Sequence, residues 1–143
     1  MLGRLNHVGV AVPSLEEAVA TYRGYFGDIS VTAAIELPQL YVRVRFIETP
    51  NSQIELLEPL ERDRGGKGGP IAKFLESHPK GGQHHLAFEV ADIHTAAADM
   101  AAKGATVLNE PRIGAHGTLV VFVHPRDFCG VLIELMEPPG GQG

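Results

Sequence analysis

Hydrophobic and polar positions follow the same order twice along the chain. The stretch HVGVAVPSLEEAVATY, from His7, begins as a strand-like run and continues as a helical pattern, and HLAFEVADIHTAAADM, from His85, repeats it. Ser14 is a suitable N-terminal cap for a helix over 14–27, and Asp92 is a suitable N-terminal cap for a helix over 92–104. Glycine ends both patterns. The pattern therefore predicts two equivalent helices, each preceded by a strand.

Three β-rich segments follow each predicted helix, and glycines and prolines separate them. The segments are ISVTAAIEL, LYVRVRFIE and SQIELLEPL in the first half, and ATVLNEP, GTLVVFVHP and GVLIELMEP in the second. A repeat of this length indicates duplicated βαβββ modules. We expect an α+β fold in a single domain over 1–143, with modules at 4–60 and 82–137. Residues 61–81 form a glycine-rich linker with one short helix.

An acidic phrase is also written twice, as IELLEP and as IELMEP. Glu55 and Glu134 occupy the same place in the last strand of each module, and His7 and His85 the same place in the first strand. Modules that pack with pseudo-twofold symmetry would bring these four side chains together. Two imidazoles and two carboxylates suit a divalent transition ion and leave coordination positions open for water or substrate. The repeat therefore predicts a metal site.

Each of these residue types also has a common structural role. A single histidine at a strand start is more often structural than a ligand, and a strand glutamate often faces solvent. Recurrence of both residue types in register favours the metal site. Glu58 and Glu137 fall on the opposite strand face, where we expect surface charges at the strand ends. The one cysteine, Cys129, is expected to be a small packed side chain near a turn.

The composition limits the classes of partner that the protein is expected to bind and the compartment in which it is expected to occur. The formal net charge of −5 argues against a nucleic acid or an anionic membrane surface as the partner. One cysteine permits no intrachain disulfide, and the sequence contains neither a signal-peptide pattern nor a membrane-spanning apolar run. These features predict a cytoplasmic protein.

Several longer segments resemble a known superfamily. The βαβββ modules with paired His and Glu positions are similar to the vicinal oxygen chelate superfamily, and the stretches GGQHH, EPRIGAHG and HPRD resemble its methylmalonyl-CoA epimerase family. The resemblance implies a curved mixed sheet around a metal site, and a homodimer. It implies a divalent ion, with cobalt favoured and manganese, nickel, zinc or magnesium as alternatives. The implied ligands are His7, Glu55, His85 and Glu134.

The same resemblance implies a reaction. Enzymes of that family interconvert (2R)- and (2S)-methylmalonyl-CoA through an enolate, so the implied substrate is an acyl-CoA and Glu134 is the implied base as well as a ligand. A second acid/base glutamate has been proposed on the third strand of some relatives, but this chain has Val44 there. The second proton donor is therefore left open. His116, in the EPRIGAHG stretch, is a candidate for a hydrogen bond to substrate.

Two other functions fit parts of the pattern. A glyoxalase I-type isomerase acting on a glutathione hemithioacetal would use the same four ligands. A metal-free protein that sequesters a small ligand would share the fold but has no need for matched His and Glu pairs. The pairs favour an enzyme over such a binding protein.

Overall fold

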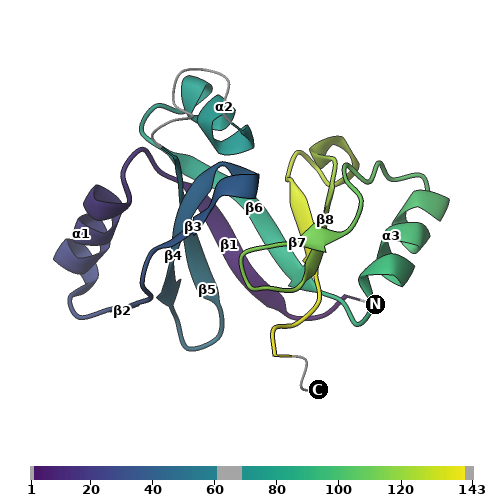
Figure 1. The fold of residues 1–143 in the computed structure, drawn as a ribbon, viewed down its shortest axis with the longest axis horizontal. Coiled ribbons are helices and arrows are strands. Elements are labelled where there is room, and N and C mark those ends of the chain that lie inside the picture. The colour runs from purple at the N-terminus through teal and green to yellow at the C-terminus, as the bar shows by residue number, and fades with distance from the viewer. Residues whose placement is uncertain (1, 61–68, 141–143) are drawn as a thin grey trace. The chain divides into compact units, whose positions relative to one another are not determined.

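The computed structural model describes residues 2–60 and 69–140. Part of the predicted linker, 61–68, lies outside these ranges. Figure 1 shows the elements in chain order. They are β1 (Leu5–Ala11), α1 (Leu15–Phe26), β2 (Ser30–Val31), β3 (Ile35–Leu37), a 3-10 turn (Pro38–Leu40), β4 (Val42–Glu48), β5 (Gln53–Pro59), α2 (Pro70–Ser77), β6 (Gly82–Glu89), α3 (Ile93–Ala102), β7 (Arg112–Ile113), β8 (Leu119–Val123), a 3-10 turn (Pro125–Asp127) and β9 (Ile133–Met136). The helix α2 matches the short helix predicted after the linker.

The chain divides into two compact units. The inner unit is Val8–His84, and the terminal unit combines Met1–His7 with His85–Gly143. Strands β1 and β6 each contribute residues to both units. The expected single domain with modules at 4–60 and 82–137 stays a prediction.

In the inner unit the strand order is β2-β4-β5-β1, and β3 pairs with β4. Strands β4 and β5 run antiparallel, with Phe46 opposite Glu55. Helix α1 packs on this sheet because its apolar stripe meets the strands. The buried cluster between them is Val12, Leu15, Val19, Ile47 and Leu56. The segment ISVTAAIEL, predicted as one strand, is divided between β2 and β3, so four strands follow α1 in this unit.

In the terminal unit the strand order is β6-β9-β8-β7. Strand β9 runs parallel to β6 and antiparallel to β8, so Glu134 lies between Ala87 and Phe122 in the register. Helix α3 lies along β8 and β9. The buried cluster there is Val90, Ile93, Ala96, Val121, Val123, Ile133 and Leu135. The mixed pairing confirms the predicted α+β fold class.

Both predicted caps are present at the helix starts. The Ser14 hydroxyl accepts a hydrogen bond from the Glu17 N–H at 3.2 Å, and the Asp92 carboxylate accepts one from the Thr95 N–H at 2.9 Å. The hydrogen bonds from Thr95 lower the pKa of Asp92. These local contacts explain why each helix begins where its capping residue stands.

Glu58 and Glu137 are not surface charges, so that prediction is wrong. The Glu58 carboxylate accepts a hydrogen bond from the Leu15 N–H at 2.7 Å, and the Glu137 carboxylate accepts one from the Ile93 N–H at 2.9 Å. Both side chains are half-buried. The first N–H groups of a helix have no partner within the helix, and the helix dipole favours a negative charge there. The second glutamate of each repeated phrase therefore ties a strand end to the start of its helix.

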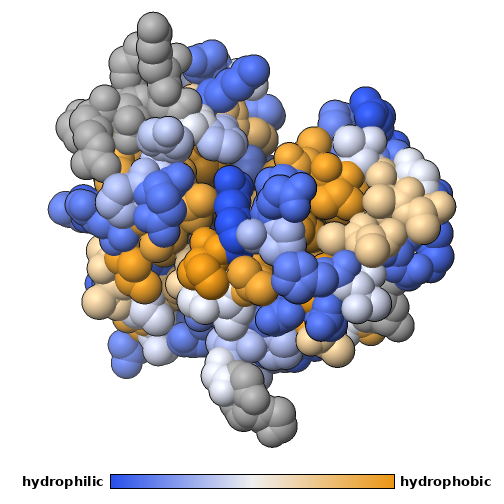
Figure 2. All heavy atoms as spheres, turned by 45° about the vertical axis from the view of Figure 1, so that its right-hand side comes forward, coloured by the Kyte–Doolittle hydropathy of each residue, from blue (hydrophilic) through white to orange (hydrophobic). Residues whose placement is uncertain are grey.

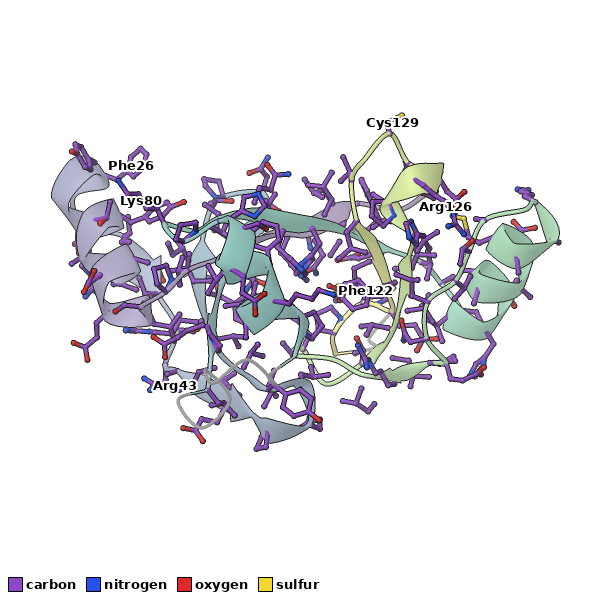
Figure 3. All side chains as sticks on the ribbon, turned by 90° about the horizontal axis from the view of Figure 1, so that it is seen from above. Phe26, Arg43, Lys80, Phe122, Arg126 and Cys129 are labelled. Carbon is purple, nitrogen blue, oxygen red and sulfur yellow. The ribbon has the colours of Figure 1, made fainter. Side chains whose placement is uncertain are left out.

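Cys129 also differs from its prediction, because its side chain is exposed. It adopts a φ of 58° in a turn that the Gly130 N–H closes on the Pro125 carbonyl at 2.8 Å. Figure 3 shows it at the tip of the loop that follows β8. The turn geometry directs this side chain away from the core.

The surface carries hydrophobic groups among polar ones. Figure 2 shows hydrophobic side chains gathered in patches between hydrophilic ones on one face. Leu108 and Ile113 are examples of exposed large apolar residues. None of the helices in the described ranges is long and apolar enough to cross a membrane.

The two helix-anchoring glutamates give a stability prediction. Glu58→Ala and Glu137→Ala should each lower the free energy of unfolding by about 1–2 kcal/mol, because each removes a carboxylate that pairs with a partly buried N–H. Urea unfolding followed by circular dichroism measures the change. Glu16→Ala, on the exposed face of α1, is the matched control and should change the free energy by less than about 0.5 kcal/mol. Equal effects of the three substitutions would contradict the anchoring role.

Candidate metal centre

Three of the four predicted ligands come together in the terminal unit. His7 is on β1, His85 on β6 and Glu134 on β9. Their exposed fractions are 1%, 2% and 6%. Burial of two imidazoles and a carboxylate is costly unless they are paired with one another or with an ion.

The donor atoms of these residues converge. His7 Nε2 lies 3.3 Å from His85 Nε2 and 3.4 Å from Glu134 Oε1, and His85 Nε2 lies 3.1 Å from the same oxygen. The two rings are nearly perpendicular, at 84°, with centroids 5.3 Å apart. Each residue therefore presents one potential ligand atom to a common point.

Electrostatics keep the Glu134 carboxyl ionised. Burial raises its pKa, but hydrogen bonds from His7 and His85 lower it by more, so that the pKa falls below the ordinary value of 4.5. An ionised carboxylate and two imidazole nitrogens that face one another form a site for a cation. This nitrogen and oxygen donor set suits a divalent transition ion.

Glu55, the fourth predicted ligand, lies on β5 in the inner unit. Its exposed fraction is 4%, and it stands opposite Phe46 in the β4–β5 register. It is a buried carboxylate, as a ligand would be. Its role as a ligand stays a prediction.

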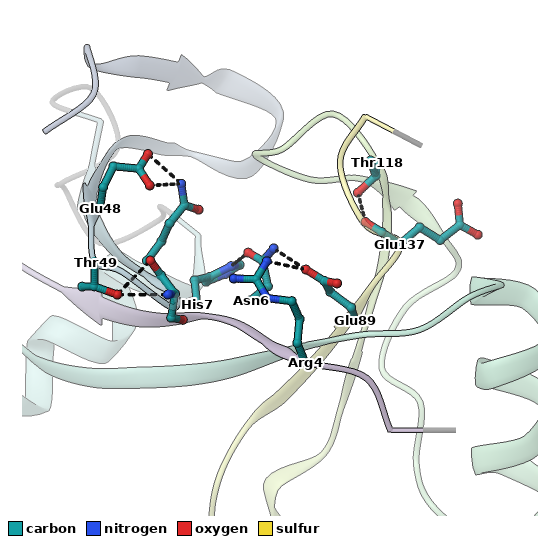
Figure 4. A network of polar contacts seen from close by, with 10 residues as sticks. Arg4, Asn6, His7, Glu48, Thr49, Glu89, Thr118 and Glu137 are labelled. Carbon is teal, nitrogen blue, oxygen red and sulfur yellow. Dashed lines mark hydrogen bonds and ion pairs between the residues drawn. The ribbon is translucent and has the colours of Figure 1, made fainter. Parts of the chain in front are cut away.

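Further polar and aromatic groups surround His7, and Figure 4 shows part of this network. His7 Nδ1 lies 2.8 Å from Asn6 Oδ1, and the Asn6 amide donates to Glu89 Oε2 at 2.9 Å. Arg4 Nη1 donates to the same carboxylate oxygen at 3.2 Å. The His116 ring stacks on the His7 ring, with centroids 5.2 Å apart and an angle of 26°. His116 is therefore beside the predicted ligand and not in a remote loop.

Asn6 and Glu89 were not among the residues predicted for the site. Asn6 is a polar residue in the strand LNHVGVA and is buried, with an exposed fraction of 4%. A polar residue next to a predicted ligand on an apolar strand was the signal that could have found it.

His84 and Val44 contribute to packing. His84, next to His85, packs edge-on against Phe74, with centroids 5.2 Å apart and an angle of 87°. Val44 is fully buried. Its aliphatic side chain offers no group for proton transfer.

The HPRD stretch forms a turn. His124 Nδ1 accepts from the Arg126 N–H at 3.0 Å, and Asp127 accepts from the Thr106 N–H at 2.9 Å. Arg126 also donates to the Thr106 hydroxyl at 2.8 Å. These contacts hold the loop after β8 and give HPRD a structural function.

Comparison with known proteins identifies the family. Residues 6–122 match the Glyoxalase/Bleomycin resistance protein/Dioxygenase superfamily. The chain therefore belongs to this superfamily, as the resemblance of its modules predicted.

Individual relatives of known name are more specific than the superfamily match. The chain is 52% identical to the ethylmalonyl-CoA/methylmalonyl-CoA epimerase of Cereibacter sphaeroides over 139 residues, which cover 96% of this chain and 99% of that protein. It is 47% identical to the mitochondrial methylmalonyl-CoA epimerase of Homo sapiens over 137 residues, or 95% of this chain and 74% of that protein. These similarities confirm the predicted resemblance to methylmalonyl-CoA epimerases.

Solved structures of methylmalonyl-CoA epimerases are also similar to this chain. A methylmalonyl-CoA epimerase in complex with methylmalonyl-CoA and NH4+ is 34% identical, with a TM-score of 0.84 and coverage of 99% of this chain and 97% of that one. The epimerase of Mycobacterium tuberculosis is 31% identical, with a TM-score of 0.82 and coverage of 94% and 87%. The vicinal oxygen chelate fold is therefore confirmed.

The donor cluster predicts stabilisation by metal. Cobalt(II) at about 100 times its dissociation constant should raise the free energy of unfolding by about 2.7 kcal/mol, because the ion binds only the folded chain. His85→Gln and Glu134→Gln should reduce this gain. Glu36→Gln, at an exposed position of β3, is the control that should keep it. Thermal unfolding with and without cobalt measures the effect.

The pH dependence of this stabilisation has a defined sign. Because the pKa of Glu134 lies below 4.5, its carboxylate stays ionised from about pH 8 to about pH 6, and protons compete with the metal for the imidazoles. The cobalt-dependent gain should therefore decrease as the pH is lowered over this range. A gain that increases towards acid pH would contradict the donor assignment.

Proposed function

We propose that the protein is an epimerase that interconverts (2R)- and (2S)-methylmalonyl-CoA by removing and returning the proton on C2. The observation that carries this function is the 52% and 47% identity to named epimerases over nearly the whole chain. The solved epimerase with bound methylmalonyl-CoA, similar over 99% of the chain, adds support for an acyl-CoA substrate. A glyoxalase I-type isomerase shares the superfamily but is not favoured by these relatives.

The residues that hold the ion in this proposal are His7, Glu55, His85 and Glu134. Their burial and donor types support the assignment. The resemblance to the epimerase family favours cobalt, and an N₂O₂ donor set accepts several divalent transition metals, cobalt among them. Ligand exchange in a buried site of this kind is compatible with catalysis when coordination positions stay open.

The chemistry follows from the acidity of C2. This carbon lies between a thioester and a carboxylate, and its deprotonation places negative charge on the thioester oxygen. A bound divalent ion supplies Lewis acidity where that charge develops. The donor side chains are themselves buried, and burial strengthens the electrostatic interactions among them.

Glu134 is the base in this proposal. Its carboxylate is buried and its pKa is lowered, so that it is ionised at neutral pH and can accept the C2 proton. Val44, fully buried, carries no acidic proton. We therefore assign removal of the C2 proton to Glu134, and delivery of a proton to the opposite face of the enolate, which inverts C2, to a second donor, either water or another side chain.

Ethylmalonyl-CoA is a second candidate substrate, because the relative from Cereibacter sphaeroides is named for both esters. The two substrates differ by one methylene, and such a difference in an apolar pocket changes kcat/KM by about 10–200-fold at most. Parallel kinetics with both esters would measure this preference.

Two expectations accompany the proposal: a homodimer and a cytoplasmic location. Sedimentation equilibrium of the purified chain measures the first, and fractionation of the source cells measures the second. Neither property is needed for the proton-transfer chemistry.

The test of the function is hydrogen exchange at C2. Protein loaded with cobalt should introduce solvent deuterium into C2 of (2S)-methylmalonyl-CoA and produce the (2R) epimer. Glu134→Gln should reduce kcat by about 10²–10⁴-fold, because general-base catalysis contributes on this scale. Nuclear magnetic resonance follows the exchange, and a coupled mutase assay follows the epimer.

Controls separate this function from its alternative. Glu36→Gln, on the exposed face of β3, should keep wild-type exchange. Removal of metal by a chelator should abolish exchange, and cobalt should restore it. Rapid turnover of the methylglyoxal–glutathione hemithioacetal without exchange on the CoA ester would replace the epimerase assignment with a glyoxalase I-type activity.

A further inference from the structure

A continuous chain of hydrogen bonds leads from the surface of the terminal unit to His7. Arg4 donates to Glu89 Oε2 at 3.2 Å, Asn6 Nδ2 donates to the same oxygen at 2.9 Å, and Asn6 Oδ1 lies 2.8 Å from His7 Nδ1. Figure 4 shows Arg4 and Asn6 beside the Glu89 carboxylate, with His7 on the other side of Asn6. Asn6 and His7 are buried, whereas the Arg4 side chain is 55% exposed.

The direction of these hydrogen bonds, from donor to acceptor, follows from the Glu89 carboxylate at which they end. A carboxylate that pairs with an arginine accepts hydrogen bonds and donates none, so the group of Asn6 that faces it is the NH₂. The oxygen of the Asn6 amide must then face His7. An amide oxygen only accepts, and the hydrogen in the short contact must therefore be on His7 Nδ1.

We propose that Asn6 is a positioning residue that accepts a hydrogen bond from His7 Nδ1–H, holds the ring with Nε2 towards His85 and Glu134, and so leaves Nε2 as the nitrogen that a divalent ion would take. Nε2 is the atom that approaches His85 and Glu134, at 3.3 and 3.4 Å. The inference rests on the proposed metal site for its effect on binding, but the hydrogen bond from Nδ1 is a property of the metal-free chain. Partners of this kind commonly change metal affinity by about 10–100-fold.

The second module has no copy of Asn6. His84 stands in the equivalent place before His85, and its ring packs edge-on against Phe74. The orientation of His7 by an amide is therefore particular to the first strand. His84→Ala provides a matched control, because it changes the residue before a predicted ligand without touching the Asn6–Glu89 contact.

Nitrogen-15 NMR of the metal-free, full-length protein reads the tautomer directly. The His7 signals are assigned by their loss in His7→Gln. Wild-type protein should show His7 with a protonated Nδ1. Asn6→Ala should lower the fraction of His7 that is protonated on Nδ1, whereas His84→Ala should leave the wild-type pattern unchanged.

Cobalt(II) titration reads the consequence for binding. Asn6→Ala should raise the dissociation constant by about 10–100-fold. Glu89→Gln should raise it less, because it frees the Asn6 amide to turn without removing it. The double variant Asn6→Asp/Glu89→Gln exchanges the donor and acceptor groups, keeps an acceptor for His7 Nδ1–H, and should restore affinity to within about threefold of wild type. A residue that only fills space would show no such restoration.

Each outcome separates this role from the metal site. Wild-type His7 unprotonated on Nδ1, or an unchanged cobalt dissociation constant in Asn6→Ala, would overturn the role of Asn6 and leave the epimerase proposal intact. Wild-type protein that binds no cobalt would overturn the metal site and the role of Asn6 in it. If Asn6→Ala does not fold, Glu89→Gln and the double variant decide by the same two measurements.

Discussion

The convergence of three buried electron-pair donors governs the chemistry of this protein. His7 Nε2, His85 Nε2 and Glu134 Oε1 lie within 3.4 Å of one another in the interior of one unit. Such atoms attract a proton or a cation into the space between them, and their burial removes the water that would otherwise screen them. The strands that carry them must therefore hold the three atoms in place.

The repeated phrase shows how the fold meets that requirement. In IELMEP the first glutamate, Glu134, belongs to the donor cluster, and the second, Glu137, binds the first N–H of α3. In IELLEP the second glutamate, Glu58, does the same for α1. Identical residues three positions apart thus have separate tasks, one facing the site and one securing the strand end to a helix.

Local features of the sequence were sufficient for most of the fold. Hydrophobic periodicity and the caps at Ser14 and Asp92 predicted the helices, because these signals act between neighbours along the chain. Duplication predicted that His7, His85 and Glu134 share one environment. The contacts of Glu58 and Asn6 were missed because their partners are distant: Asn6 and Glu89 are 83 positions apart. No periodic pattern reports which backbone N–H or carboxylate such a side chain will meet. The exposure of Cys129 was missed for a related reason, since its direction depends on a turn with positive φ.

The division of the chain into units has a consequence for biosynthesis. The inner unit is one continuous stretch, Val8–His84, whereas the terminal unit needs Met1–His7 together with His85–Gly143. A polypeptide leaves the ribosome from its N-terminus, and compact units fold as they emerge. His7 is therefore synthesised early, whereas His85 and Glu134 are present only after the whole inner unit and then β9 have been synthesised. A cation held by these residues is acquired only when nearly the entire polypeptide has been made.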